Sequence, residues 1–187
     1  PEVWLKAPIL YLAGRDPPTL SAAQQKRLRQ YVEQGGTIVA DANCSSKEFT
    51  EAMRKLAAAV FPESPLEVLP EDHAIYSSYE RLPVAWPIEG VTFGCRTSFL
   101  LSSKDLGCSW ELLSRPESAA GLKMGLNIAA YATAGQPLPE RLAAVASSAS
   151  TVNVKMDRMA LYVGKVHHHG RDWNSRPQAM DRLLEEL

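Results

Sequence analysis

The first sixty residues alternate between segments typical of buried strands and segments typical of amphipathic helices. Residues 8–13 form a short apolar run, and residues 22–34 place their apolar side chains on one helical face. A second strand is predicted over residues 37–40, and a second helix follows from Ser45 to Phe61. Such alternation favours a parallel sheet with helices on its faces, so we predict an α/β fold.

Short local signals mark where these helices begin and end. Ser21 with Gln24 forms a capping-box pattern, and Ser45 with Glu48 forms another. Gly35 is a helix stop, because glycine accepts the left-handed conformation that ends many helices.

The rest of the chain has weaker patterns. The proline-rich residues 66–87 predict a long ordered loop of the kind that is functional or forms a lid. Residues 91–101 predict one bent strand or two short strands around Gly94, and residues 117–132 predict a helix. A last strand is predicted over residues 159–168, and a last helix begins at Ser175.

Composition excludes some classes of partner. The 187 residues carry a net charge of −1 at pH 7, so we expect no nucleic-acid contact. No apolar run approaches the roughly 20 residues that span a bilayer, so no membrane contact is expected from this segment. The first residue is Pro1 rather than methionine, so we expect an internal piece whose partners include other domains of a larger parent protein.

The three cysteines are Cys44, Cys95 and Cys108. Their odd number and wide spacing predict neither a zinc ribbon nor a disulfide framework. We expect free thiols, with a Cys95–Cys108 bridge across a hairpin as the alternative.

Several short patterns of this chain occur together in one known family. They are Leu28-Arg29-x-Tyr31-x-x-x-Gly35-Gly36-x-x-x-x-Asp41, Phe61-Pro62, Leu69-Pro70-x-Asp72-His73-x-Ile75-Tyr76, Gly94-x-Arg96, Asp105-Leu106-Gly107-x-x-Trp110 and Lys123-Met124-Gly125-x-Asn127. As a set they cover residues 8–135, and the chain resembles a bacterial family catalogued as domain of unknown function 4159. No activity follows from the resemblance.

The resemblance has implications for the fold. The family is grouped with class I glutamine-amidotransferase-like folds, which implies a three-layer α/β/α sandwich with a mainly parallel, flavodoxin-like sheet. Ligands of open α/β sheets bind outside the carboxyl ends of the strands.

The end of the chain resembles the beginning of the family's usual domain. The similar residues are Gly170-x-Asp172-Trp173-Asn174 and Pro177-x-Ala179-Met180. We predict a domain core over residues 1–142, a connector over 143–157 and a βα unit over 158–187. That unit either completes the sheet of a circularly permuted domain or begins a second copy. A connector that cannot close within one chain would give a strand-swapped homodimer.

Catalytic candidates also follow from the resemblance. The nucleophile of amidotransferase-like folds is a cysteine on a sharp turn between a strand and a helix, and Cys44 has that position. His73 is the one histidine outside residues 167–169 that could act as its base. The usual Gly-x-Cys-x-Gly turn is absent, so Cys44 is either a nucleophile or an ordinary cysteine near a strand end. Asp41 with His73 is the other catalytic candidate.

Polar residues near strand ends are the candidates for ligand binding, namely Asp41, Asn43, His73, Arg96, Asp105 and Asp172. Asp41 either contacts a polar ligand or metal, or accepts hydrogen bonds from loop amides. We predict that Asp41, Asn43, His73, Arg96 and Asp172 lie around one cleft.

Two pairs of charged residues remain open to more than one interpretation. Asp72 and His73 form either an acid–base pair or a clasp that holds their loop. Arg96 either pairs with Asp105 near the same edge or presents its guanidinium to a ligand carboxylate.

The histidine run near the end is the candidate metal site. Alternate residues of a strand share a face, so His167 and His169, together with Asp172, could supply three ligands. The alternative is that these are ordinary polar residues at a strand end.

Two classes of function follow. The first is a non-catalytic binding or interaction module on an amidotransferase-like scaffold, favoured by the missing turn sequence. The second is a hydrolase or amidotransferase-type enzyme that uses Cys44 or Asp41 with His73. No cofactor is predicted, and the sequence indicates no compartment.

Overall fold

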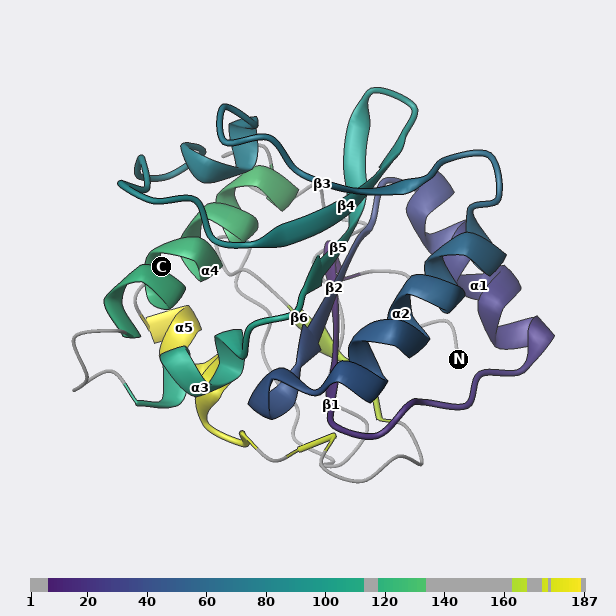
Figure 1. Ribbon diagram of the computed structural model, residues 1–187, viewed down its shortest axis with the longest axis horizontal. Helices are drawn as coiled ribbons and strands as arrows, with labels where there is room; N and C mark the ends of the chain where they lie inside the picture. The colour runs from purple at the N-terminus through teal and green to yellow at the C-terminus, as the bar shows by residue number, and fades with distance from the viewer. Residues whose placement is uncertain (1–6, 113–117, 134–162, 168–172, 175, 186–187) are drawn as a thin grey trace, which may run out of the picture.

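Figure 1 shows the computed structural model, which describes residues 7–112, 118–133, 163–167, 173–174 and 176–185. Its elements are, in chain order, β1 (Ile9–Gly14), α1 (Ala22–Glu33), β2 (Thr37–Ala42), the 3-10 helix η2 (Asn43–Ser45), α2 (Lys47–Val60), β3 (Leu66–Val68), the 3-10 helix η3 (Ala74–Tyr76), β4 (Ile88–Phe93), β5 (Arg96–Ser102), α3 (Leu106–Glu111), α4 (Ser118–Thr133), β6 (Val163–Lys165) and α5 (Ala179–Glu185).

The first four major elements follow the predicted alternation of strands and helices. The predicted capping box is present at α1, where Ser21 N donates to Gln24 Oε1 at 2.8 Å and Gln24 N donates to Ser21 Oγ at 3.3 Å. The helix stops at Gly35, whose φ of +94° suits glycine. The second predicted cap is wrong by one residue: Ser46 caps α2, because Ser45 lies in η2.

The six strands form one sheet in the order β3-β4-β5-β2-β1-β6. The pairs β5-β2, β2-β1 and β1-β6 are parallel, whereas β3-β4 and β4-β5 are antiparallel. The prediction of a mainly parallel sheet is therefore not confirmed, since the sheet is mixed. Only Gly94 and Cys95 join β4 to β5, and so short a connection can join only antiparallel neighbours. Of the two predictions for residues 91–101, the pair of short strands around Gly94 is the one observed.

Each face of the sheet carries its own apolar core. Leu10 and Leu12 of β1 face one cluster, which contains Phe49 of α2, while Ile9 and Tyr11 face the other. Neighbouring strand residues point to opposite faces, which explains why β1 is apolar throughout. Helices α1 and α2 lie on one side of the sheet and α3, α4 and α5 on the other (Figure 1).

The long predicted loop contains β3 and η3 and is fastened to α4. The side-chain oxygen of Asn127 accepts hydrogen bonds from the amides of Tyr79 and Glu80, and its Nδ2 donates to the Glu80 carbonyl. This loop is therefore held against α4 by a buried side chain.

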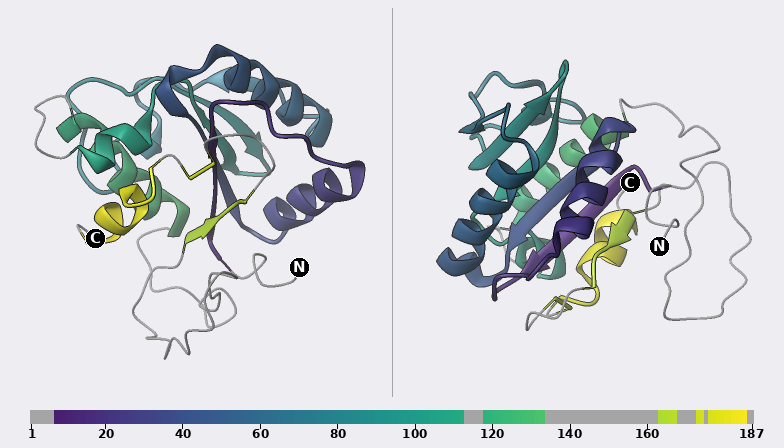
Figure 2. Two further views of the ribbon diagram at one scale, coloured as in Figure 1. Left: turned by 90° about the horizontal axis from the view of Figure 1, so that it is seen from below. Right: turned by 90° about the vertical axis from the view of Figure 1, so that its right-hand side faces the viewer.

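The tail supplies β6 and α5. β6 pairs with β1 in register Ile9 with Val163 and Tyr11 with Lys165, so it lies at an edge of the sheet (Figure 2). In α5, Leu183 is buried in the same core cluster as α3 and α4. Within the described residues, no helix combines the length and the apolar character needed to cross a membrane.

Candidate functional site

The strands β1, β2 and β5 end together at one side of the sheet. Asp41 of β2 lies there between Ala13 of β1 and Ser102 of β5. We call this region, with η2 and the start of α3, the carboxyl edge. It is the position at which open α/β sheets bind ligands.

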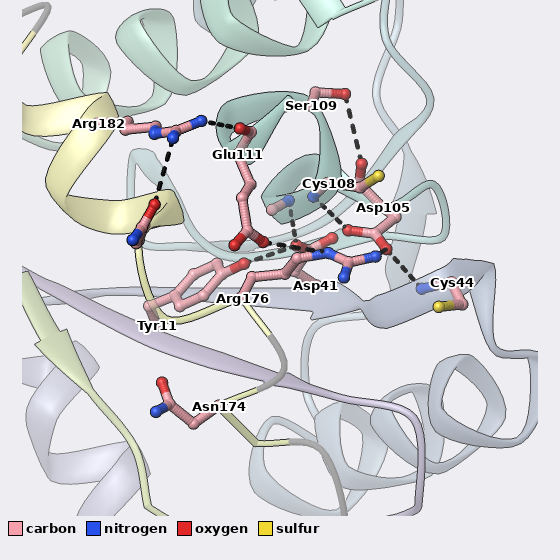
Figure 3. A network of polar contacts seen from close by, with 12 residues as sticks. Tyr11, Asp41, Cys44, Asp105, Cys108, Ser109, Glu111, Asn174, Arg176 and Arg182 are labelled. Atoms are coloured by element: carbon pink, nitrogen blue, oxygen red, sulfur yellow. Dashed lines mark hydrogen bonds and ion pairs between the residues drawn. The ribbon is translucent and has the colours of Figure 1, made fainter. Parts of the chain in front are cut away.

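Asp41 is fully buried at the carboxyl edge, and its oxygens accept three hydrogen bonds. Oδ1 accepts from the amide of Leu106 at 3.0 Å. Oδ2 accepts from the amide of Gly107 at 2.8 Å and from the Tyr11 hydroxyl at 2.6 Å. The carboxyl group thus ties β1 and β2 to the first turn of α3 (Figure 3).

Burial dominates the electrostatics of this group. Burial and then the charge of Asp105 raise the pKa of Asp41 to about 7, although its three hydrogen bonds act in the opposite direction. Burial, followed by the charge of Asp41, also raises the pKa of Tyr11 well above its ordinary value. The Tyr11 hydroxyl therefore remains a hydrogen-bond donor at neutral pH.

Asp105 joins α3 to the turn after β2. Its Oδ1 accepts from the amide of Cys108 at 2.6 Å, as the N-cap of α3, and its Oδ2 accepts from the amide of Cys44 at 2.6 Å. A carboxylate that bonds two amides from distant segments fixes their separation.

Arg176 from the tail completes the carboxyl edge. Its guanidinium lies 3.6 Å from Asp105 Oδ2 and 3.6 Å from Glu111 Oε2. Arg182 of α5 donates to the Glu111 carbonyl, so the tail contacts α3 at two points (Figure 3).

A family model described as Domain of unknown function (DUF4159) matches residues 3–133. The chain belongs to this family. The match confirms the resemblance noted in the sequence, and no curated protein matches the chain. The DUF4159 range holds β1 to α4, whereas β6, Arg176 and α5 lie outside it.

Asp41, Asn43 and Asp105 of this DUF4159 chain lie at the carboxyl edge. Asp41 lies at the end of β2, and Asp105 is near enough for its charge to act on Asp41. Asn43 is buried in η2, directly after β2, and its backbone carbonyl accepts from the Ser46 amide.

Cys44 is exposed on the turn between β2 and α2, with a left-handed φ of 54°. A left-handed cysteine between a strand and a helix resembles the predicted nucleophile turn in position. Its backbone amide, however, donates a hydrogen bond to Asp105 Oδ2.

His73 does not lie at the carboxyl edge. It caps η3, its Nδ1 accepts from the Ile75 amide at 3.2 Å, and its Nε2 lies 3.0 Å from Thr97 Oγ1. Thr97 precedes Ser102 by five residues of β5, which is about 17 Å along a strand. The structure therefore does not bring His73 to Asp41 or Cys44, and it favours the loop clasp over the acid–base pair.

Arg96 lies at the opposite end of the sheet, so the single cleft predicted for these residues is wrong. Its guanidinium donates to the Gly35 carbonyl, to Thr37 Oγ1 and to the Ala132 carbonyl. Thr37 begins β2 and Arg96 begins β5, which are parallel, so both belong to the amino ends of the strands. The predicted pair of Arg96 with Asp105 is wrong as well, because the arginine beside Asp105 is Arg176.

The predicted metal ligands are only partly described. His169 and Asp172 lie outside the described residues, while the ring of His167 packs 4.3 Å from that of Trp173. Across the parts of the chain that the structure describes, no three histidine, cysteine or carboxylate side chains form a metal-binding group.

Sequence reasoning missed three members of the carboxyl edge: Tyr11, Glu111 and Arg176. Tyr11 lies within an apolar strand and therefore looks like an ordinary core residue. Its buried hydroxyl nevertheless requires a polar partner. Glu111 and Arg176 lie on segments far apart in the chain, and no local pattern joins them.

Proposed function

We propose that this chain is a non-catalytic binding or interaction module built on an amidotransferase-like scaffold. The observation that carries the proposal is the use of both carboxylates at the carboxyl edge. Asp41 accepts from Tyr11 and two amides of α3, and Asp105 accepts from the amides of Cys44 and Cys108. A general base needs a lone pair within reach of a substrate proton, whereas these oxygens already hold the fold together.

The scaffold part of the proposal rests on the parallel half of the sheet. The strands β6, β1, β2 and β5 are neighbours and parallel, and helices pack on both faces. We infer that this half corresponds to a three-layer, flavodoxin-like domain to which the β3–β4 strands are added.

The tail carries a related proposal about chain order. Its βα unit resembles the family's first unit, and β6 pairs directly with β1. We infer a circularly permuted domain rather than the start of a second copy, because α5 also contributes Leu183 to a core shared with α3 and α4. The ligand or partner of the module is then another domain or a polar molecule held at the carboxyl edge, where the loop at residues 14–18 is exposed for much of its length.

The second candidate function is a hydrolase or amidotransferase-type enzyme using Cys44 or Asp41 with His73. One observation favours it: Cys44 is exposed, on a left-handed turn that leads into the long helix α2. Against it, the described residues place no histidine in a hydrogen bond with the Cys44 thiol.

Chemical labelling of the thiols distinguishes the two candidates. Cys95 is a matched control, since it is also exposed but lies in the β4–β5 turn. In a non-catalytic module, iodoacetamide alkylates Cys44 and Cys95 at rates within about tenfold, and a diazo-ketone analogue of glutamine labels neither. Stoichiometric labelling of Cys44 by the analogue in the Cys95→Ser variant, lost in Cys44→Ser, would establish the enzyme.

Binding at the carboxyl edge is tested by nuclear magnetic resonance of the ¹⁵N-labelled chain. A panel of amides, carboxylates and nucleotides is added at millimolar concentration. The proposal expects shifts at the amides of Cys44, Lys104 and Cys108 with no conversion of the ligand. Conversion of a ligand would support the enzyme, and shifts confined to other parts of the chain would place the binding surface elsewhere.

A further inference from the structure

Two cysteines that are far apart in the chain meet at the carboxyl edge. Asp105 Oδ2 accepts from the amide of Cys44 and Oδ1 accepts from the amide of Cys108, each at 2.6 Å. Two nitrogens bound to the two oxygens of one carboxylate lie no more than about 7 Å apart. Figure 3 shows both side chains beside the Asp105 carboxylate.

The two thiols differ in a way that suits sequential reaction. Cys44 is exposed, and Cys108 is half-buried in the first turn of α3. A solvent-borne oxidant therefore reaches Cys44 first, and the neighbouring thiol can then act as the resolving group.

The guanidinium of Arg176 lies 3.6 Å from Asp105 Oδ2, beside the carboxylate that both amides bind. Burial opposes the charge of Arg176, but Asp105 and then Cys108 and Cys44 raise the pKa of its guanidinium.

We propose that Cys44 and Cys108 form a redox pair, which a two-electron oxidant such as hydrogen peroxide converts to an intramolecular disulfide. The Cys44 sulfur attacks one peroxide oxygen, the O–O bond breaks, and the other oxygen leaves as water with the thiol proton. The Cys108 sulfur then attacks the resulting sulfenic acid, the S–O bond breaks, and a second water leaves. The two thiols lose two electrons, which reduce the peroxide to water.

The disulfide would join η2 to α3 covalently at the place where Asp105 joins them by hydrogen bonds. Disulfide geometry requires Cα atoms closer than about 7 Å, so formation of the bond requires η2 and α3 to hold the two residues within that distance. The proposal goes beyond the binding function and holds whether or not that function is correct.

The test uses the full chain with Cys95→Ser, which leaves the proposed pair as its two thiols. The protein is treated with equimolar hydrogen peroxide, alkylated, digested without reduction and analysed by mass spectrometry. The expected product is a linked pair of peptides containing Cys44 and Cys108, on a monomer, that dithiothreitol reverses.

Dibromobimane, which becomes fluorescent when it links two thiols, measures their proximity without oxidation. The proposal expects fluorescence from the Cys95→Ser chain and none after a further Cys44→Ser or Cys108→Ser change. Oxidation that yields only sulfinic acids or intermolecular dimers, or a bimane adduct without fluorescence, would overturn the proposal.

Discussion

Asp41 is buried with its carboxyl group among a hydroxyl and two amides, so its protonation should be visible in the stability of the fold. Burial raises its pKa in the native state from 3.8 to about 7. Between about pH 4 and pH 7 the native chain therefore holds a proton that the unfolded chain has released. The free energy of unfolding should fall as pH rises through this range and then level off.

The variant Asp41→Asn removes this titration and also turns one acceptor into a donor. We expect it to cost about 1–3 kcal/mol at pH 5, because a buried amide of α3 loses its partner. The fall in stability between pH 4 and 7 should also become smaller. Urea denaturation at several pH values measures both effects, with Asp16→Asn as an exposed control. An unchanged pH dependence in Asp41→Asn would show that Asp41 is ionised throughout.

The titration of His73 should have the opposite effect, so that its contribution to the free energy of unfolding rises with pH. Burial lowers the pKa of its ring below 6.5, because removal from water disfavours the charged form. The neutral ring accepts from the Ile75 amide. Above the unfolded pKa its contribution to stability is fully present, and it is lost as pH falls through the lower pKa of the native state. Proton resonance titration of the ring should give a pKa below 6.5, whereas a value at or above 6.5 would contradict this account of the ring's environment.

At the scale of residues, the sequence predicts where a side chain lies in a strand or helix better than it predicts which groups that side chain contacts. Asp41 could be placed at a strand end because it directly follows an apolar run. Whether it would bind a ligand or loop amides depended on Leu106 and Gly107, which are distant in the chain. Arg96 was misplaced because the β4–β5 turn reverses the chain, so the residue after that turn begins its strand at the amino ends of β2 and β5.

Helix α1 offers a direct test of how one element is held to the sheet. Leu28 is buried against the cluster that contains Leu10 and Phe49. Leu28→Ala should lower the free energy of unfolding by about 2–5 kcal/mol, as a core truncation. Its exposed neighbour supplies the control, since Arg27→Ala should change stability by at most about 0.5 kcal/mol. Equal effects of the two changes in chemical denaturation would show that the helix face is assigned wrongly.

Helix α5 depends on a glycine in α4. A Cβ at Gly125 would lie 2.6 Å from Leu183 Cδ1 and 2.7 Å from Trp110 Nε1. Gly125→Ala should therefore cost about 1–3 kcal/mol through overpacking, despite the better helix propensity of alanine. Hydrogen exchange should show faster exchange in α5, while Lys123→Ala on the more exposed side leaves α5 protected. Unchanged protection in Gly125→Ala would mean that α5 is not seated on α4 as described.

At the scale of elements, the clearest predictions came from segments with their own periodicity. The segments β1, α1, β2 and α2 were found because each repeats apolar residues at the spacing of its own structure. The short α3 was not predicted, since six residues carry too little periodicity to be recognised. The sequence could not show that β3, β4 and β5 are antiparallel, because short apolar strands look alike in parallel and antiparallel sheets.

For the whole molecule, the tail is the part whose removal should matter most. Deleting residues 159–187 removes β6 and α5, and so uncovers β1 and the core around Leu183. We expect an insoluble or molten product, detected by dye binding and by loss of the near-ultraviolet dichroism signal. The deletion removes an edge strand of the sheet rather than a central one. A soluble, cooperatively folded deletion variant would show that the tail is merely appended.

The oligomeric state of the full chain separates the two ways of closing the sheet. A permuted domain that closes within one chain should be a monomer by light scattering at all concentrations. A swapped pair should appear as a dimer in which β6 of one chain pairs with β1 of the other. The sequence leaves this choice open because the predicted connector, residues 143–157, could reach in either arrangement; it lies outside the described residues.

The pairing of β6 with β1 also has a consequence for synthesis on the ribosome. β1 emerges from the ribosome well before its neighbour β6. At about 5–20 residues per second, the roughly 150 residues between them take on the order of 10–30 s to translate. Throughout that interval one side of an apolar strand is open to other chains, so nascent polypeptides should rely on chaperones until the tail arrives.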